Sequence, residues 1–290
     1  MPDEAVTHDR LAGRVSRGGP IGVLLAQGLS RPTRRHAVLV TNRGKVQGFG
    51  VVSHRRGLSC WDVERLEVAR DAEGAWPELL EGLSGPVSLQ GGQRLLLRLA
   101  EGSALDRAAR EAEFKPYCSE EHFVFAARVH PGRQAEDVPG VRLAVDDDEF
   151  GLYQLYRAAS SPLVREAEGL TVDQWKESRP ALTGWRTQGQ YIFESEGRII
   201  GWAAVSRRGS AAMIEIMATD AKGEAARALA AAALQGAQGA STTLCLVPGY
   251  QQPVASALLA SGFVKRGGYA LYVKHVTARV RQPEIAMARA

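Results

Sequence analysis

An internal repeat is the feature that most constrains how this chain can fold. Residues 48–57 (GFGVVSHRRG) resemble residues 201–209 (GWAAVSRRG), and residues 69–74 (ARDAEG) resemble residues 218–223 (ATDAKG). The interval then stays constant at 149 residues in three successive pairs, which are Gly74 and Gly223, Phe114 and Phe263, and Val124 and Val273. A constant interval over so long a stretch predicts two copies of one structural unit.

Both copies show the same order of expected strands and helices. Short apolar runs separated by turn glycines predict strands, and apolar residues at helical spacing predict helices. The first copy predicts strands at 36–41, 46–53, 60–68 and 94–99, helices at 77–83 and 104–111, and two final strands around Lys115 and at 123–129. The second predicts strands at 191–194, 199–206, 212–217 and 243–247, helices at 224–234 and 253–260, and two final strands at 264–266 and 269–276.

This order predicts an α/β (α+β) architecture, in which each copy forms its own mixed, mostly antiparallel sheet flanked by helices. The second copy also has a leading strand at 141–145 and helices at 149–159 and 172–179. The first copy has no room for all of these elements, so we expect only one or two shortened helices within residues 4–30.

The segment between the copies predicts a linker. Residues 131–140 (PGRQAEDVPG) are polar and rich in helix and strand breakers. We therefore expect an N-terminal domain over residues 1–130 and a C-terminal domain over residues 141–290. Each would have the length of an ordinary single domain.

Composition argues against several classes of protein. The 290 residues are 45% hydrophobic and 23% charged, with a net charge of +4 spread along the chain, which does not favour nucleic-acid binding. Three cysteines without a ligand spacing predict neither a disulfide framework nor a metal site. No apolar run approaches the roughly 20 residues of a membrane helix. Without a signal-peptide pattern, we expect a cytoplasmic protein without membrane contact.

The repeated order resembles the GNAT superfamily of N-acetyltransferases. Residues 244–247 (LCLV), the helix at 253–260 and residues 261–263 (SGF) look like the family's fifth strand, fourth helix and Gly-Phe ending. The first copy offers 95–99 (LLLRL) and 113–117 (EFKPY) at the same places. Some members of this superfamily also pair two such domains, so the resemblance implies a tandem arrangement.

The resemblance implies that acetyl-CoA lies where the fourth and fifth strands separate. Its pyrophosphate would bind N–H groups at the start of the next helix, because those groups lack helical partners. The family pattern is Arg/Gln-x-x-Gly-x-Gly/Ala, and here Ala225 and Arg227 replace its two key small residues. A solvated turn that opens an Ala-rich helix explains this segment equally well. The implied cofactor-binding residues are Met217, Lys222, Gly223, Glu224, Ala225, Arg227 and Gln251.

The first copy is a poorer candidate for this cofactor. Trp76 would fill space that the phosphate needs, and Pro77 removes one N–H donor. Glu73 and Glu78 add negative charge beside a dianion. We therefore expect the first copy to have a structural role and to pack on the second.

The family's catalytic residues are carried over only in part. A tyrosine general acid often stands five residues before the Gly-Phe phenylalanine, but these positions are Ala109 and Leu258. The family's cofactor-contacting Asn corresponds to Gln251, which can form similar hydrogen bonds or can be a solvated loop residue. Glu215, on the fourth strand, matches the position of a general base, although strand alternation can also direct it to a solvated face.

Two functions are compatible with these patterns. One is an acetyl-CoA-dependent N-acyltransferase that acts on a small-molecule or peptide amine, with Trp175, Trp185 and Tyr191 as residues that could line the acceptor pocket or belong to the core. The other is a non-catalytic tandem GNAT-like protein that binds a ligand or partner. The sequence leaves the acceptor, the acyl chain and the oligomeric state open.

Overall fold

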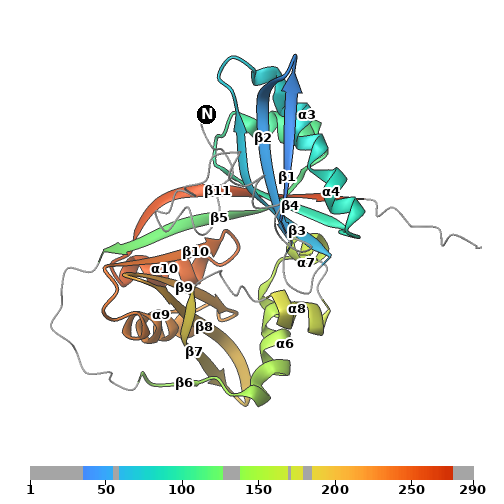
Figure 1. The fold of residues 1–290 in the computed structure, drawn as a ribbon. Helices are drawn as coiled ribbons and strands as arrows, with labels where there is room; N and C mark the ends of the chain where they lie inside the picture. Colours follow the sequence, from blue (N-terminus) through green and yellow to red (C-terminus); the bar gives the residue numbers. More distant parts are fainter. Residues whose placement is uncertain (1–34, 55–58, 127–137, 169–170, 179–184, 277–290) are drawn as a thin grey trace, which may run out of the picture.

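In the computed structural model of the protein, one continuous sheet of eleven strands joins the two halves (Figure 1). The structure describes residues 35–54, 59–126, 138–168, 171–178 and 185–276. The strand order is β1-β2-β3-β4-β11-β5-β10-β9-β8-β7-β6. The helices expected within residues 4–30, the turn at 55–57 and most of the expected linker lie outside the described residues.

The strands are β1 (Arg35–Asn42), β2 (Lys45–His54), β3 (Cys60–Val68), β4 (Arg94–Ala100), β5 (Lys115–Ala126), β6 (Val141–Leu143), β7 (Arg186–Ser195), β8 (Arg198–Arg208), β9 (Ala211–Ala218), β10 (Thr242–Pro248) and β11 (Val264–His275). The α-helices are α3 (Trp76–Gly82), α4 (Ser84–Leu89), α5 (Leu105–Glu111), α6 (Glu149–Ala159), α7 (Pro162–Glu168), α8 (Val172–Ser178), α9 (Glu224–Gly236) and α10 (Gln252–Ala260). None of the described helices is both long and apolar enough to cross a membrane.

The predicted order of elements is confirmed over the described residues, with two kinds of difference. Helices α4 and α7 were not predicted. The final pair of strands predicted for each copy is one long strand, β5 or β11. Where a break between two strands was expected, the ladder between β5 and β11 contains a bulge instead. The extra residue of the bulge is Tyr117 in β5 and Arg266 in β11. Neighbours on both edges keep each strand continuous through its bulge.

The final strand of each half pairs with the other half. Strand β5 lies between β11 and β10, and β11 lies between β4 and β5. Figure 1 shows these two long strands running together across the middle of the molecule. The prediction of a separate sheet for each copy is therefore wrong. This strand exchange satisfies the edges of β4 and β10, which would otherwise expose unpaired N–H and C=O groups.

The register between β5 and β11 reproduces the interval of the sequence repeat. Lys115 lies opposite Val273, and Val264, which is 149 residues after Lys115, lies opposite Val124. A step of 149 residues thus leads from Lys115 to Val264 and from Val124 to Val273, so it converts one of these pairs into the other. A contact that maps onto itself in this way has the symmetry of a twofold dimer interface.

Helices cover both faces of the second half's sheet. The apolar core under α9 and α10 contains the inward residues of β9, Ile214 and Ile216. A smaller cluster under α6 and α8 contacts Trp202 and Met217 on the opposite face. Gly201 allows α9 to approach closely, since a Cβ there would lie 2.6 Å from Cδ1 of Leu229.

Candidate active site

Strands β9 and β10 pair with each other over only the first part of their length. Their parallel ladder runs from Ala211 and Thr242 to Ile214 and Cys245. Beyond Ile214, β9 continues to pair with β8, and beyond Cys245, β10 continues to pair with β5. The two strands therefore separate in the middle of the sheet, and each presents an edge toward the opening between them.

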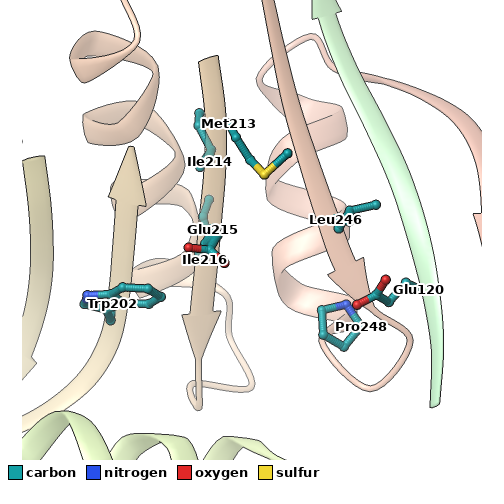
Figure 2. Close-up of a pocket in the computed structure, with 8 residues that line it drawn as sticks. All are labelled: Glu120, Trp202, Met213, Ile214, Glu215, Ile216, Leu246 and Pro248. Atoms are coloured by element: carbon teal, nitrogen blue, oxygen red, sulfur yellow. The ribbon is translucent and has the colours of Figure 1, made fainter. Parts of the chain in front are cut away.

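A cavity of about 190 Å³ occupies this opening. Its lining residues are Glu120, Trp202, Met213, Ile214, Glu215, Ile216, Leu246 and Pro248 (Figure 2). Of the catalytic and cofactor-binding residues that the sequence analysis named, Glu215 is in this set and the others are not.

Glu215 reaches the cavity because of strand alternation. It is half-buried and lies opposite Ala204 of β8, and neighbouring Ile214 and Ile216 belong to the core under α9. Successive side chains of a strand point to opposite faces, so Glu215 shares its face with Met213 and Met217. A carboxylate at a cavity wall can accept a proton from a bound amine, which is the chemistry that a general base supplies.

A second carboxylate, that of Glu120, lines the same cavity, and sequence reasoning missed it. Glu120 belongs to β5, where it lies opposite Pro248 of β10. Its Oε2 accepts a hydrogen bond from Nε of Arg98 at 2.8 Å, and the two side chains are only 12% and 13% exposed. The only signal in the sequence was that two glutamates, Glu120 and Glu121, are adjacent. The sequence pattern did not indicate that the strand containing them pairs with β10 of the other half.

The predicted pyrophosphate site at the start of α9 already contains an internal carboxylate. Gly223 is the N-cap residue with φ of 70°, and Oδ2 of Asp220 accepts a hydrogen bond from the Ala225 N–H at 3.1 Å. Lys222 and Arg227 are exposed, and an Nη1 of Arg227 donates to the Lys222 carbonyl. With Glu224 in the first turn, two acidic and two basic side chains surround this helix start.

Gln251 has a structural environment that the sequence analysis did not foresee. It is buried, so the interpretation as a solvated loop residue is wrong. Its Oε1 accepts from the Ala218 N–H at 3.2 Å, and its Nε2 donates to the Ala159 carbonyl at 3.3 Å. Gln251 therefore ties the ends of β9 and α6 together beside the start of α10.

The two positions of the family's tyrosine are in the core. Leu258 in α10 and Ala109 in α5 are fully buried, and they contribute to the cores of the two halves. Another phenol, that of Tyr250, follows the cavity residue Pro248 in the loop before α10, and burial raises its pKa. A phenol with a raised pKa stays protonated at neutral pH.

The aromatic residues proposed for the acceptor pocket do not line the cavity. Trp175 is buried in α8 and packs against Tyr153 and Tyr156 of α6. Tyr191 packs on the core under α9, and Trp185 is half-buried just before β7. The aromatic wall of the cavity is instead Trp202 of β8, whose Nε1 donates to Oε1 of Gln190 at 3.2 Å.

The first half has a corresponding opening with different side chains. Strands β3 and β4 pair only from Cys60 and Arg94 to Asp62 and Leu96, and then separate. Arg65 lies opposite Val51 in β2, as Glu215 lies opposite Ala204 in β8, so an arginine stands at the position of the carboxylate. Arg65 forms a largely buried ion pair with Glu67 of the same strand.

Metal ligands do not gather in the described part of the chain, where no group of three or more His, Cys, Asp or Glu side chains could hold an ion. The candidate site consists of two carboxylates and an apolar wall at the point where two strands separate.

Comparison with known proteins identifies the fold. No protein-family model matches the sequence, and no curated protein matches it. A GCN5-related N-acetyltransferase from Sphaerobacter thermophilus aligns with a TM-score of 0.54 and 17% identity, over 94% of this chain and 95% of that one. A tandem GNAT protein from the clavulanic acid biosynthesis pathway aligns with a TM-score of 0.51 and 13% identity, over 94% of this chain and 98% of that one.

A conserved protein of unknown function from Staphylococcus epidermidis aligns with a TM-score of 0.51 and 12% identity, over 83% of this chain and 94% of that one. At these identities the likeness concerns the fold. The chain has the GNAT acetyltransferase fold, and it aligns over nearly its whole length with a protein that carries this fold in tandem.

Proposed function

We propose that the protein is an acetyl-CoA-dependent N-acyltransferase that transfers an acyl group to an amine. The second half, residues 141–290, would hold the cofactor in the opening between β9 and β10. The first half, residues 1–130, would be a degenerate copy with a structural role. The observation that carries the proposal is the end of the ladder at Ile214 and Cys245, together with a cavity there that has Glu215 on its wall.

The geometry supports direct transfer. A separated strand edge offers N–H and C=O groups to an extended, amide-containing arm, as a sheet edge does to an added strand. Glu215 would take a proton from the acceptor amine, which then attacks the thioester carbonyl without a covalent enzyme intermediate. The departing thiolate is a good leaving group, because a thiol of this kind has a pKa of about 8.5 by analogy with cysteine.

The first half is less suited to this chemistry. Arg65 stands in place of the base, and its ion pair with Glu67 supplies two charged groups along the separated strand β3. Trp76 and Pro77 open the following helix, with Glu78 in its first turn. A base is therefore missing at the matching position, and the helix start has lost an N–H donor.

A second candidate function is a non-catalytic protein that uses the same opening to bind a ligand or partner. The observation that favours it is the carboxylate of Asp220 on the Ala225 N–H. This hydrogen bond occupies a donor that a pyrophosphate would use, and it places negative charge where an anion would have to bind.

Calorimetry and thermal unfolding with acetyl-CoA, longer acyl-CoAs and free coenzyme A test the proposal. A ligand that binds only the native state raises the unfolding midpoint. We expect an acyl-CoA to bind and its thioester to be consumed when amines are added. Binding without turnover across a broad amine panel would favour the non-catalytic function, and no binding of any acyl-CoA would reject the acyltransferase.

A further inference from the structure

We propose that Glu120 binds the acceptor amine as an ammonium ion, so that the site selects cationic primary amines and is shared by the two halves. The inference rests on the proposed acyl transfer and names both a substrate class and a residue for it. Its starting point is the exchanged strand β5, which brings a side chain of the first half to the second half's cavity.

The position of Glu120 follows from the register of the sheet. It lies opposite Pro248, the last residue of β10, where the opening between β9 and β10 is wide. Figure 2 shows Glu215 on β9 at one side of the opening, with Pro248 and Glu120 at the other side. Two carboxylates therefore face one small cavity from different strands.

Glu120 forms an ion pair with a group outside the cavity. Arg98 belongs to β4, and it reaches Glu120 across the intervening strand β11. The pair is mostly buried, so its attraction is screened less than that of a surface ion pair. Arg98 does not line the cavity, and neither Lys, Arg nor His is among the described residues that do.

The remaining wall suits an alkylammonium group. Trp202 presents an aromatic ring whose orientation is held by its hydrogen bond to Gln190. Indole faces attract cations, and Met213 and Leu246 supply an apolar lining for a short carbon chain. A cation is the form in which a primary amine, with a pKa of about 10, exists at neutral pH.

The two carboxylates then have separate roles. The ammonium binds between them, and Glu215 accepts one proton to leave a neutral amine with a free electron pair. The C–N bond forms as the C–S bond breaks, and the second nitrogen proton goes to the coenzyme A thiolate. Glu120 stays paired with Arg98 and takes no part in the proton transfer. Removing Glu120 should therefore weaken amine binding, whereas removing Glu215 should slow the chemical step.

Binding is tested first without any acyl donor. Isothermal calorimetry is run with n-butylamine, n-hexylamine and benzylamine, each against the alcohol of the same shape. At least one amine should bind about tenfold or more tightly than its alcohol, and Glu120→Gln should weaken that binding by about tenfold. The control is Glu121→Gln, because Glu121 is the next residue of β5 and pairs with Lys265 outside the cavity. It should leave amine binding unchanged.

Kinetics separate the two roles. With acetyl-CoA present and thiol release recorded, Glu120→Gln should raise KM for the amine about tenfold and change kcat by less than about threefold. Because Glu120→Gln removes the carboxylate that pairs with the largely buried Arg98, the double variant Glu120→Gln with Arg98→Met checks that misfolding is not the cause. It should show the same loss of amine binding and a cooperative thermal transition.

The proposal is overturned if none of the amines binds, if the alcohols bind equally well, or if Glu120→Gln binds amines like the wild type. These outcomes are distinct from failure of the proposed function. Amine binding that depends on Glu120, in a protein that does not bind acetyl-CoA, would retain the cation site and reject the acyltransferase. Acetyl-CoA turnover with an unchanged KM for the amine in Glu120→Gln would retain the acyltransferase and reject the cation site.

Discussion

Glu120 and Tyr269 lie directly opposite each other in β5 and β11, and they are separated in sequence by the repeat interval of 149 residues. Equivalent positions of the two halves therefore meet at the centre of the strand exchange. Only a contact centred on a local twofold axis can bring equivalent residues together in this way. The same exchange that places Glu120 at the cavity of the second half also makes each half depend on the other for its final strand.

This dependence predicts that the halves do not fold separately. Residues 141–290 expressed alone would leave the β10 edge that pairs with β5 exposed, and residues 1–130 alone would leave β4 without β11. Exposed edges of this length favour aggregation. We expect each half to lack a cooperative thermal transition and co-expression of both to restore a complex. A cooperative transition for either half alone would contradict this prediction.

Gly201→Ala should destabilise the protein by about 1–3 kcal/mol, because an added methyl overpacks the contact between β8 and α9. The new Cβ would lie 2.6 Å from Leu229 and 3.2 Å from Ala225. Gly85→Ala in α4 is the matched control, since its Cβ would meet no atom within 4 Å. Urea denaturation measures both free energies of unfolding. Equal stabilities of the two variants would show that α9 can move away from the sheet.

Glu215→Gln should lower kcat by about 10²–10⁴-fold and leave acetyl-CoA affinity nearly intact, because Gln keeps the shape of the side chain but cannot accept the proton. Steady-state kinetics with an identified amine acceptor, together with acetyl-CoA calorimetry, measure the two effects. Glu166→Gln, at an exposed position of α7, should be neutral. A Glu215→Gln enzyme with wild-type kcat would remove the base from the proposed mechanism.

Substitutions at the start of α9 should move acyl-CoA affinity in opposite directions. Lys222→Glu with Arg227→Glu adds negative charge to the predicted phosphate site and should abolish binding. Asp220→Asn removes the carboxylate that now accepts from Ala225, so it should strengthen binding even though the helix cap is weakened. Glu73→Ala in the first half is the control, with little change expected. If calorimetry showed that the double variant binds acyl-CoA with normal affinity, the phosphates would bind elsewhere.

His122 should make the protein less stable in mild acid. Burial lowers the pKa of His122, so the unfolded chain binds a proton at a higher pH than the folded one. The free energy of unfolding should be constant above the unfolded pKa of about 6.5 and should fall as the pH drops below it. His122→Phe should reduce this slope between about pH 6.5 and 5, and His36, whose pKa burial also lowers, should account for part of the remainder.

Chemical denaturation at a series of pH values gives these slopes. His275→Phe is the comparison variant, because His275 is exposed at the end of β11. If His122→Phe and the wild type lost stability in parallel below pH 6.5, the buried imidazole would not be the group that titrates.

The sequence alone determined the order of elements, and it named one residue of the cavity wall, Glu215 on β9. Turn glycines and apolar spacing are local signals, and they predicted strands such as β3 and helices such as α6 at their observed bounds. Glu215 was a candidate because it matches the position at which the resembled family often has a general base, on the fourth strand. The repeat interval was also readable, because it depends only on comparing the chain with itself.

Only the tertiary structure decided which strands are neighbours. Backbone N–H and C=O groups are nearly the same in every residue, so strand pairing cannot be read from local sequence. Nothing local therefore indicated that β5 would pair with β10 or that β11 would pair with β4. For the same reason Glu120 and Arg98 could not be connected to the opening beside Glu215, and Gln251 could not be recognised as a buried tie between β9 and α6. The sequence specifies the units and their interval, whereas long-range packing decides how the two halves combine into one sheet and one cavity.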